Sequence, residues 1–256
     1  MKRLKPPKIA GFRQECEMLA APETFEPEAF RGNEKVPQAV CNFVLVLALI
    51  YNDCKDAIYA HIALDASKPD EPYRKSKVWG AITGAQMHAL RVVTGLLHEL
   101  LNVIRANEDV LSNEFFVDLV RHLSPKSRDA WQALVSVAQG ATPTSKLGKQ
   151  LLLIRNKASF HYDGKAIFTG YARHFLSAKP NDDRGYVSRG ASMRTTRFYF
   201  ADAAGSAYFR SVAGSEETET LQTELEEIVD RTNYGLMMIV GAFIQRRGFS
   251  FRQEPV

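Results

Sequence analysis

Apolar residues recur every three or four positions along most of this 256-residue chain, which is the spacing of one buried helix face. The first such stretch begins at Val36 and is apolar on most sides in its middle, so it predicts a long central helix. The next begins at Trp79 and carries a near-heptad stripe to Ile104, the pattern by which antiparallel helices pack side by side. A loop with two prolines (66–76) separates the two helices.

Shorter helices follow, and local signals mark their ends. Ser112 is expected to cap a helix that buries phenylalanines. Ser124-Pro125 is a start signal, with Ser at the N-cap and Pro at the first helical position, and Gly140 suits the end of that helix. Thr142-Pro143 or Thr144 opens the next helix, and Ser215 is expected to cap a last long one.

These patterns predict a mostly α fold, an up-and-down helical bundle in a single domain, 1–256. Residues 1–35 show no sustained period and are interpreted as an irregular arm, and 36–175 as the helical core. Residues 176–214 contain several helix breakers and predict an irregular insert, with a short strand at 195–201 (TTRFYFA). The long helix in 215–256 is expected to pack back on the core.

Composition narrows the class of protein. The chain is 45% hydrophobic and 24% charged, as is usual for a folded protein. Cys16, Cys41 and Cys54 form no CxxC pair, which favours a reducing compartment, and we expect a cytoplasmic protein. No signal peptide is recognisable, and the longest apolar runs fall below the ~20 residues that span a bilayer, so no membrane association is expected. The net charge of +4 is compatible with nucleic acid but does not imply it.

Several familiar catalytic motifs are missing. The chain has no GxGxxG, GxxxxGK[ST] or GxSxG sequence. Its six histidines show no HExxH or HxH spacing, and together with the scattered cysteines they form no zinc set. We therefore expect neither a metal nor another cofactor.

One stretch does point to chemistry, IRNKASFHYD at 154–163, where an apolar helix abruptly acquires polar groups. If residues 147–162 form one straight helix at ~100° per residue, Arg155 and His161 flank a single apolar stripe and Asn156 points away. Arg155 and His161 are then ~9 Å apart along the axis, too far to touch. A two-fold axis would bring Arg155 of one chain towards His161 of another, so a homodimer is part of the hypothesis.

Such a pair suits metal-independent RNA cleavage. His161 titrates near neutrality and can act as general base on a ribose 2′-hydroxyl or as general acid on the leaving oxygen. Arg155 would hold the scissile phosphate and stabilise its developing charge, while Asn156 positions a neighbouring group. Lys157 and Lys165 are candidates for contacts with RNA phosphates.

The pattern Arg155-Asn156-x4-His161 resembles the R-x(4–6)-H motif of HEPN domains (higher eukaryotes and prokaryotes nucleotide-binding). The resemblance covers about ten residues and the general fit of a long-helix bundle. It implies an all-α, usually dimeric protein of a family rich in RNases of toxin–antitoxin, abortive-infection and other defence systems. It also implies Arg155 and His161 as the catalytic pair, Asn156 as the supporting polar residue, and an antitoxin or other protein as a partner.

The chain departs from that family in two respects. Tyr162 follows His161 directly, whereas antitoxin-modified toxins carry a tyrosine two residues after the histidine, so no modified tyrosine is inferred. Residues 176–256 have no counterpart in the small toxins.

Other interpretations stay open. In a non-catalytic scaffold or partner-binding protein, Arg155 would pair with Asp163 and Asn156 would satisfy a backbone group at a helix bend. A small-molecule enzyme with a pocket in the bundle is a third class. In the insert, aspartates dilute a set of side chains that resembles a basic and aromatic nucleic-acid surface: Arg184, Arg189, Arg194, Arg197, Phe198 and Tyr199.

Overall fold

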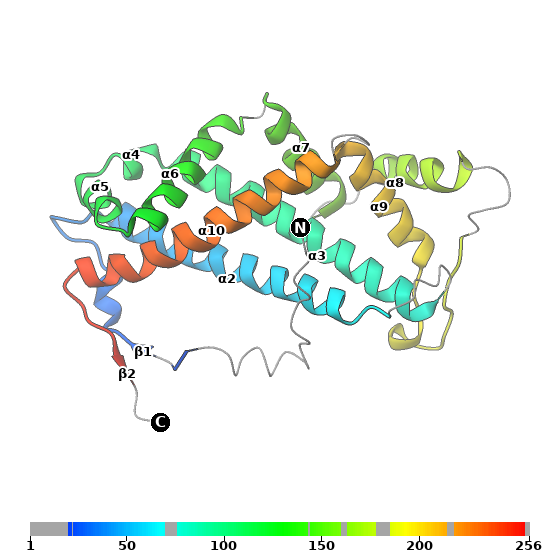
Figure 1. Ribbon diagram of the computed structural model, residues 1–256, viewed down its shortest axis with the longest axis horizontal. Coiled ribbons are helices and arrows are strands. Elements are labelled where there is room, and N and C mark those ends of the chain that lie inside the picture. Colours follow the sequence, from blue (N-terminus) through cyan, green and yellow to red (C-terminus); the bar gives the residue numbers. More distant parts are fainter. Residues whose placement is uncertain are drawn as a thin grey trace. The chain divides into compact units, whose positions relative to one another are not determined.

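The computed structural model describes the fold of most of the chain. The described residues are 20, 21, 23–69, 76–142, 144–159, 163–177, 185–213 and 218–253, with backbone alone for 158, 194, 213 and 218–224. They are mostly helical, with one two-stranded sheet, which confirms the predicted mostly α helical bundle (Figure 1). Among them, no helix combines the length and the apolar composition that crossing a bilayer requires.

The chain groups into two compact units. The motif unit contains Asp56–Gly95 and Lys146–Gln222, and the aromatic unit contains the described parts of 16–55 together with Leu96–Ser145 and 223–253. Three long helices contribute to both units, α2 (Gln38–Ala66), α3 (Lys77–Ala106) and α10 (Thr218–Arg246). The single domain predicted for 1–256 stays a prediction.

The aromatic unit adds short helices to its parts of α2, α3 and α10. Its other elements are β1 (Glu23–Thr24), the 3-10 turn η1 (Pro27–Phe30), α4 (Glu108–Leu111), α5 (Glu114–Arg121), α6 (Pro125–Gly140) and β2 (Arg252–Gln253). The two strands pair antiparallel, Glu23 with Gln253 and Thr24 with Arg252. The predicted irregular arm therefore contains a strand and a 3-10 turn in its described part.

The core of the aromatic unit is a cluster of three rings. Phe43 of α2, Phe116 of α5 and Trp131 of α6 meet edge to face at centroid distances of 5.6, 6.4 and 5.8 Å. All three side chains are buried. Gly235 of α10 lies against the backbone of Trp131, where a Cβ would come within 3.3 Å of the Trp131 nitrogen. These contacts join four helices through one cluster.

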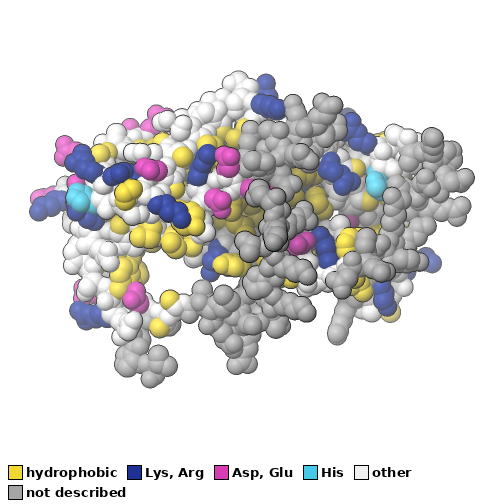
Figure 2. Space-filling model, in the orientation of Figure 1, with side chains coloured by type: hydrophobic (Ala, Val, Ile, Leu, Met, Phe, Trp, Pro, Cys, Tyr) yellow, Lys and Arg dark blue, Asp and Glu magenta, His cyan; other side chains and the backbone are white. Residues whose placement is uncertain are grey.

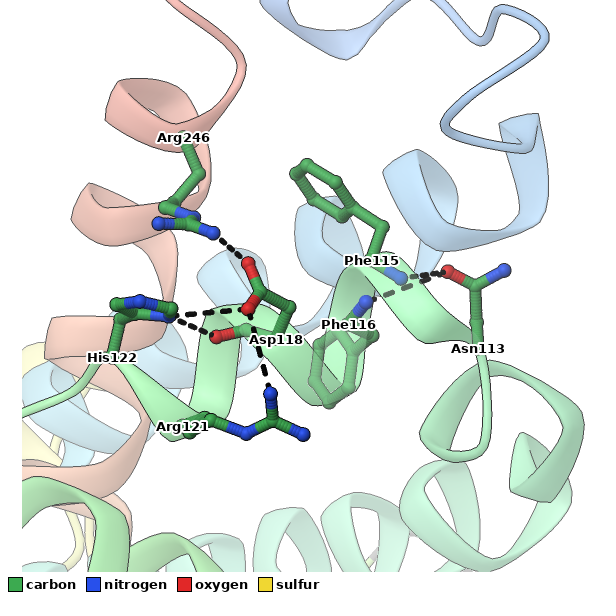
Figure 3. A network of polar contacts seen from close by, with 7 residues as sticks. All are labelled: Asn113, Phe115, Phe116, Asp118, Arg121, His122 and Arg246. Atoms are coloured by element: carbon green, nitrogen blue, oxygen red, sulfur yellow. Dashed lines mark hydrogen bonds and ion pairs between the residues drawn. The ribbon is translucent and has the colours of Figure 1, made fainter.

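Capping side chains fix the short helices of this unit. Ser124 Oγ accepts from the Ser127 N–H at 3.3 Å, Pro125 follows it, and α6 ends at Gly140, as predicted. The predicted Ser112 cap of α5 is wrong by one residue, because Asn113 Oδ1 accepts from the N–H groups of Phe115 and Phe116 (Figure 3). Asn113 has the extended backbone that an N-cap needs.

The last turns of α5 and α10 meet at one carboxylate. Figure 3 shows Asp118 with the guanidinium of Arg246, the guanidinium of Arg121 and the imidazole of His122 directed at it. His122 Nδ1 also lies 2.8 Å from the backbone oxygen of Asp118. The cluster fixes the end of α10, where Gly248 takes the positive φ of 85° that follows many helices.

The motif unit contains the stretch of interest. Its own elements are α7 (Lys146–Ile154), the π-turn η2 (Arg155–Ser159), α8 (Gly164–Tyr171), the π-turn η3 (Ala172–Leu176), the 3-10 turn η4 (Met193–Thr195) and α9 (Tyr199–Ala213). Helices α8 and α9 touch through backbone, since a Cβ on Gly170 would stand 2.1 Å from the Ala204 oxygen. Only glycine permits this approach.

The predicted insert is more regular than its sequence indicated. Residues 199–213 form helix α9 instead of irregular chain. Within the predicted strand at 195–201, Arg197 forms an isolated antiparallel bridge with Ser188, and Tyr199 already begins α9. The predicted cap at Ser215 lies outside the described residues.

Candidate functional site

The apolar helix before the motif ends where the motif begins. Leu151 and Ile154 of α7 are fully buried, as their place on the predicted stripe required. At Arg155 the backbone changes from α to π geometry, and η2 continues to Ser159. The straight helix assumed for 147–162 is therefore wrong beyond Ile154, and so are the angles projected from it, because a π-turn is wider than an α-turn.

Arg155 and Asn156 stand together at the start of the π-turn. Arg155 Nη1 donates a hydrogen bond to Asn156 Oδ1 at 2.8 Å, and both residues are half-buried. The amide thus holds one edge of the guanidinium. His161, with Phe160 and Tyr162, lies outside the described residues, so its position relative to Arg155 stays a prediction.

The end of the π-turn is anchored on α3. Ser159 is buried, and its Oγ donates to the backbone oxygen of Arg91 at 2.8 Å. This bond satisfies a buried hydroxyl and fixes the last residue before the motif histidine segment.

Lys157 forms an ion pair with Asp163. The scaffold interpretation had predicted Arg155 as the partner of that carboxylate. The Lys157 ammonium and the Asp163 carboxylate form an ion pair, and Asp163 Oδ1 also accepts from the Ala166 N–H at 3.0 Å, which caps α8. Hydrogen bonding to Asp163 raises the pKa of Lys157. The same bond, aided by the Ala166 N–H, holds the pKa of Asp163 below its usual value. Lys157 therefore serves the local structure, while Lys165 is exposed in the first turn of α8.

Tyr208 of α9 is a neighbour that sequence reasoning missed. Burial raises the pKa of its phenol, while the Lys157 ammonium lowers it and the Asp163 carboxylate raises it, so the charges of this ion pair act on Tyr208. No sequence signal connected residue 208 to the motif, because the segment around it was predicted to be irregular.

Two residues of the predicted insert, Arg197 and Tyr199, make contacts that stabilise the fold. Arg197 Nε lies 3.0 Å from Asp202 Oδ2, so its charge is neutralised. Tyr199 is buried, stacks on Tyr186 at 4.5 Å, and donates to the Lys77 oxygen at 3.1 Å. These contacts remove Arg197 and Tyr199 from the basic and aromatic surface that the sequence suggested. Arg184 and the side chain of Arg194 lie outside the described residues.

The guanidinium of Arg155 is of the chemical type that binds anions. Arg155 presents a planar, half-exposed donor fork whose orientation Asn156 supports, a geometry that suits a phosphate. In the described part of the chain, no three His, Cys, Asp or Glu side chains gather as metal ligands. No protein-family model matches this chain, and neither a curated protein nor a solved structure shows a significant match to it.

Proposed function

We propose that this protein is a HEPN-like, metal-independent endoribonuclease of a toxin or other defence system, acting on cytoplasmic RNA with Arg155 and His161 as its catalytic pair. The observation that carries the proposal is the π-turn that begins at Arg155. Such turns are rare inside helices and often mark functional sites. Here the turn ends a buried apolar stripe and leaves Arg155 and Asn156 half-exposed.

The chemistry is a transesterification within the RNA strand. The ribose 2′-oxygen attacks the neighbouring phosphorus, and His161 accepts the proton of that hydroxyl. The bond to the 5′-oxygen of the next nucleotide breaks, and that oxygen takes up a proton. Arg155 binds the phosphate and stabilises its added negative charge in the transition state. The products are a 2′,3′-cyclic phosphate and a 5′-hydroxyl, and no oxidant or metal enters the balance.

Asn156 is a positioning residue in this proposal. Its amide oxygen accepts from Arg155, so it holds the guanidinium towards the phosphate. The proposal includes a homodimer, in which Arg155 of one chain and His161 of the other complete each site, and an antitoxin partner that restrains the activity.

The test is RNA cleavage in EDTA by the full chain and its variants. Arg155→Ala and His161→Ala should each lower cleavage by about 100-fold or more, the range for a lost acid–base or electrostatic group. Their melting temperatures should stay near that of the wild type. Arg210→Ala and His88→Ala, at exposed positions of α9 and α3, are matched controls that should cleave normally.

The same experiment tests the competing interpretation of a non-catalytic scaffold. If Arg155 and His161 only hold the fold together, their removal should lower the free energy of unfolding by about 2 kcal/mol or more. Wild-type protein that leaves all RNA intact, together with destabilised variants, would establish the scaffold and refute the nuclease.

A further inference from the structure

The helix that follows the motif has an unusual charge pattern. Residues 164–176 (GKAIFTGYARHFL), which form α8 and η3, and the following Ser177 contain Lys165, Arg173 and His174 and no Asp or Glu. Asp163, the nearest acidic residue before them, is paired with Lys157. The segment is therefore cationic without internal neutralisation.

Its exposed side chains share one face. Apart from Gly164 and Ser177 at the two ends, the exposed positions recur mostly at spacings of three and four, which places them along one side of the helix: Lys165, Phe168, Thr169, Arg173 and Leu176. The opposite side packs on α9 at Gly170. We call these five residues the α8 face.

The apolar members of the α8 face are large and unusually open. Phe168 is 61% exposed and Leu176 is 64% exposed. At the place of α8 on the molecular surface, Figure 2 shows cationic, histidine and hydrophobic side chains together. An exposed aromatic ring among cations differs from the usual isolated surface apolar residue.

Behind Phe168 the rings continue as a ladder. Phe168 and Tyr171 are nearly parallel, with centroids 6.3 Å apart and an interplanar angle of 18°. Tyr171 meets Phe175 at 4.9 Å, and Phe175 meets His174 edge to face at 4.4 Å. Tyr171 therefore packs beside the Phe168 ring, and most of the Phe168 side chain stays exposed to solvent.

Exposed rings between cations are the recognition chemistry of single-stranded nucleic acid. Bases stack on the ring while Lys and Arg contact the phosphates, and every base offers a face for stacking. Lys165 and Arg173 lie eight positions apart, ~12 Å along the helix axis, a span of a few nucleotides. Paired bases in a duplex would not be free to stack on Phe168.

We propose that the α8 face binds single-stranded RNA, with an unpaired base stacked on Phe168 and phosphates on Lys165 and Arg173. The choice of RNA rests on the proposed function, since the face lies on the helix that follows the motif. Binding is tolerant of sequence and weakens with salt, with a logarithmic slope of about −0.7 for each phosphate contacted. The face would deliver a single strand to the nuclease site without taking part in the chemistry.

The experiment measures binding separately from cleavage. A fluorescein-labelled 2′-O-methyl oligouridine cannot be cleaved, because it lacks the 2′-hydroxyl that would attack the phosphorus. Its fluorescence anisotropy therefore reports binding affinity alone. Phe168→Ala should weaken binding about 10-fold or more, and Phe168→Trp should restore it, since one base stack is lost and then replaced. Arg173→Ala should reduce the salt slope by about 0.7. Tyr59→Ala (45% exposed, on α2) and Arg210→Ala are matched controls that should bind like the wild type.

The outcomes separate this inference from the proposed function. If the wild-type protein binds the strand through Phe168 but cleaves no RNA, the α8 face stands and the proposed nuclease is refuted. If the wild type cleaves RNA and Phe168→Ala binds the strand as well as the control Tyr59→Ala does, the nuclease stands and the α8 face is refuted. A wild type that does not bind the strand also refutes the face, and so does one that binds vesicles of anionic phospholipid through Phe168 instead.

Discussion

The ion pair between Lys157 and Asp163 joins the π-turn η2 to the N-cap of α8. The two residues bracket 160–162, the segment that contains His161, and Asp163 caps α8 at the same time. The pair therefore joins the residues on either side of the segment that contains the proposed catalytic histidine. The pair gives Lys157 a local partner, and its contact with an RNA phosphate stays a prediction.

The pH dependence of this pair follows from its two pKa shifts. The pKa of Asp163 is lowered from 3.8, so the pair contributes stability above that value and loses it as the pH falls through the lowered folded pKa. The pKa of Lys157 is raised from 10.5, so the contribution is present below that value and is lost as the pH rises through the raised folded pKa. Carboxyl NMR should give Asp163 a pKa below its usual value, and Lys157→Met should raise it again. Lys165→Met is the matched control, and equal Asp163 titrations in the two variants would contradict the pairing.

The backbone contact between α8 and α9 makes a second prediction. Gly170→Ala should lower the free energy of unfolding by about 1–3 kcal/mol, because its Cβ would meet the Ala204 oxygen at 2.1 Å and the Tyr208 nitrogen at 2.8 Å. Backbone atoms cannot move aside as a flexible side chain can. Gly164→Ala, in the same helix with nothing within 4 Å, should change stability by less than about 1 kcal/mol. Urea unfolding measures both, and equal effects would show that α8 and α9 are not in backbone contact.

The aromatic cluster predicts a large effect at Trp131. Its ring is buried between Phe43 and Phe116, so Trp131→Ala should cost about 3–5 kcal/mol through a cavity that the fixed helices cannot fill. Trp79, which is only half-buried, is the comparison, and Trp79→Ala should cost clearly less. Guanidinium unfolding followed by circular dichroism decides between them. A cost at Trp131 no greater than at Trp79 would argue against the cluster as the core.

Cys54 should be chemically silent in the folded protein. Burial, with a smaller contribution from the neighbouring Asp53 carboxylate, raises the pKa of its thiol to about 12, so almost no thiolate exists at pH 8. In a Cys16→Ser/Cys41→Ser variant, which keeps Cys54 alone, a disulfide reagent should react slowly until guanidinium unfolds the chain. Rapid reaction in native buffer would show that Cys54 is accessible.

The sequence predicted elements whose signals are local. The Ser124-Pro125 start and the Gly140 end of α6 are correct because a cap, a fixed φ and a stop act within a few residues. The cap of α5 is Asn113 and not Ser112, since both types cap well and only the extended backbone of residue 113 distinguishes them.

Helix α9 could not be predicted from apolar periodicity. Besides Tyr199 and Phe209, its buried residues are small and follow one another directly, Ala204, Gly205, Ser206 and Ala207, so they lie on more than one side of the helix. Such residues bury little apolar area and produce no hydrophobic stripe, so tertiary packing determines that this segment is helical.

Only part of the candidate site could be predicted from the sequence, because the rest depends on backbone geometry and tertiary packing. Arg155 and Asn156 are recognisable by residue type, and the stripe of Leu151 and Ile154 is confirmed. The change from α to π geometry at Arg155 leaves no mark in the residue pattern, and Tyr208 lies against α8 at Gly170 only because α9 packs there.

The most direct test of the proposed nuclease is the end-group chemistry of RNA incubated with the full chain in EDTA. We expect fragments that end in a 2′,3′-cyclic phosphate, and no cut where a single 2′-deoxynucleotide replaces the attacking ribose. Arg155→Ala and His161→Ala should form these fragments at least about 100-fold more slowly, and Arg210→Ala should form them at the wild-type rate. Intact RNA with the wild-type protein, or fragments that Arg155→Ala and His161→Ala form at the wild-type rate, would contradict the proposed nuclease.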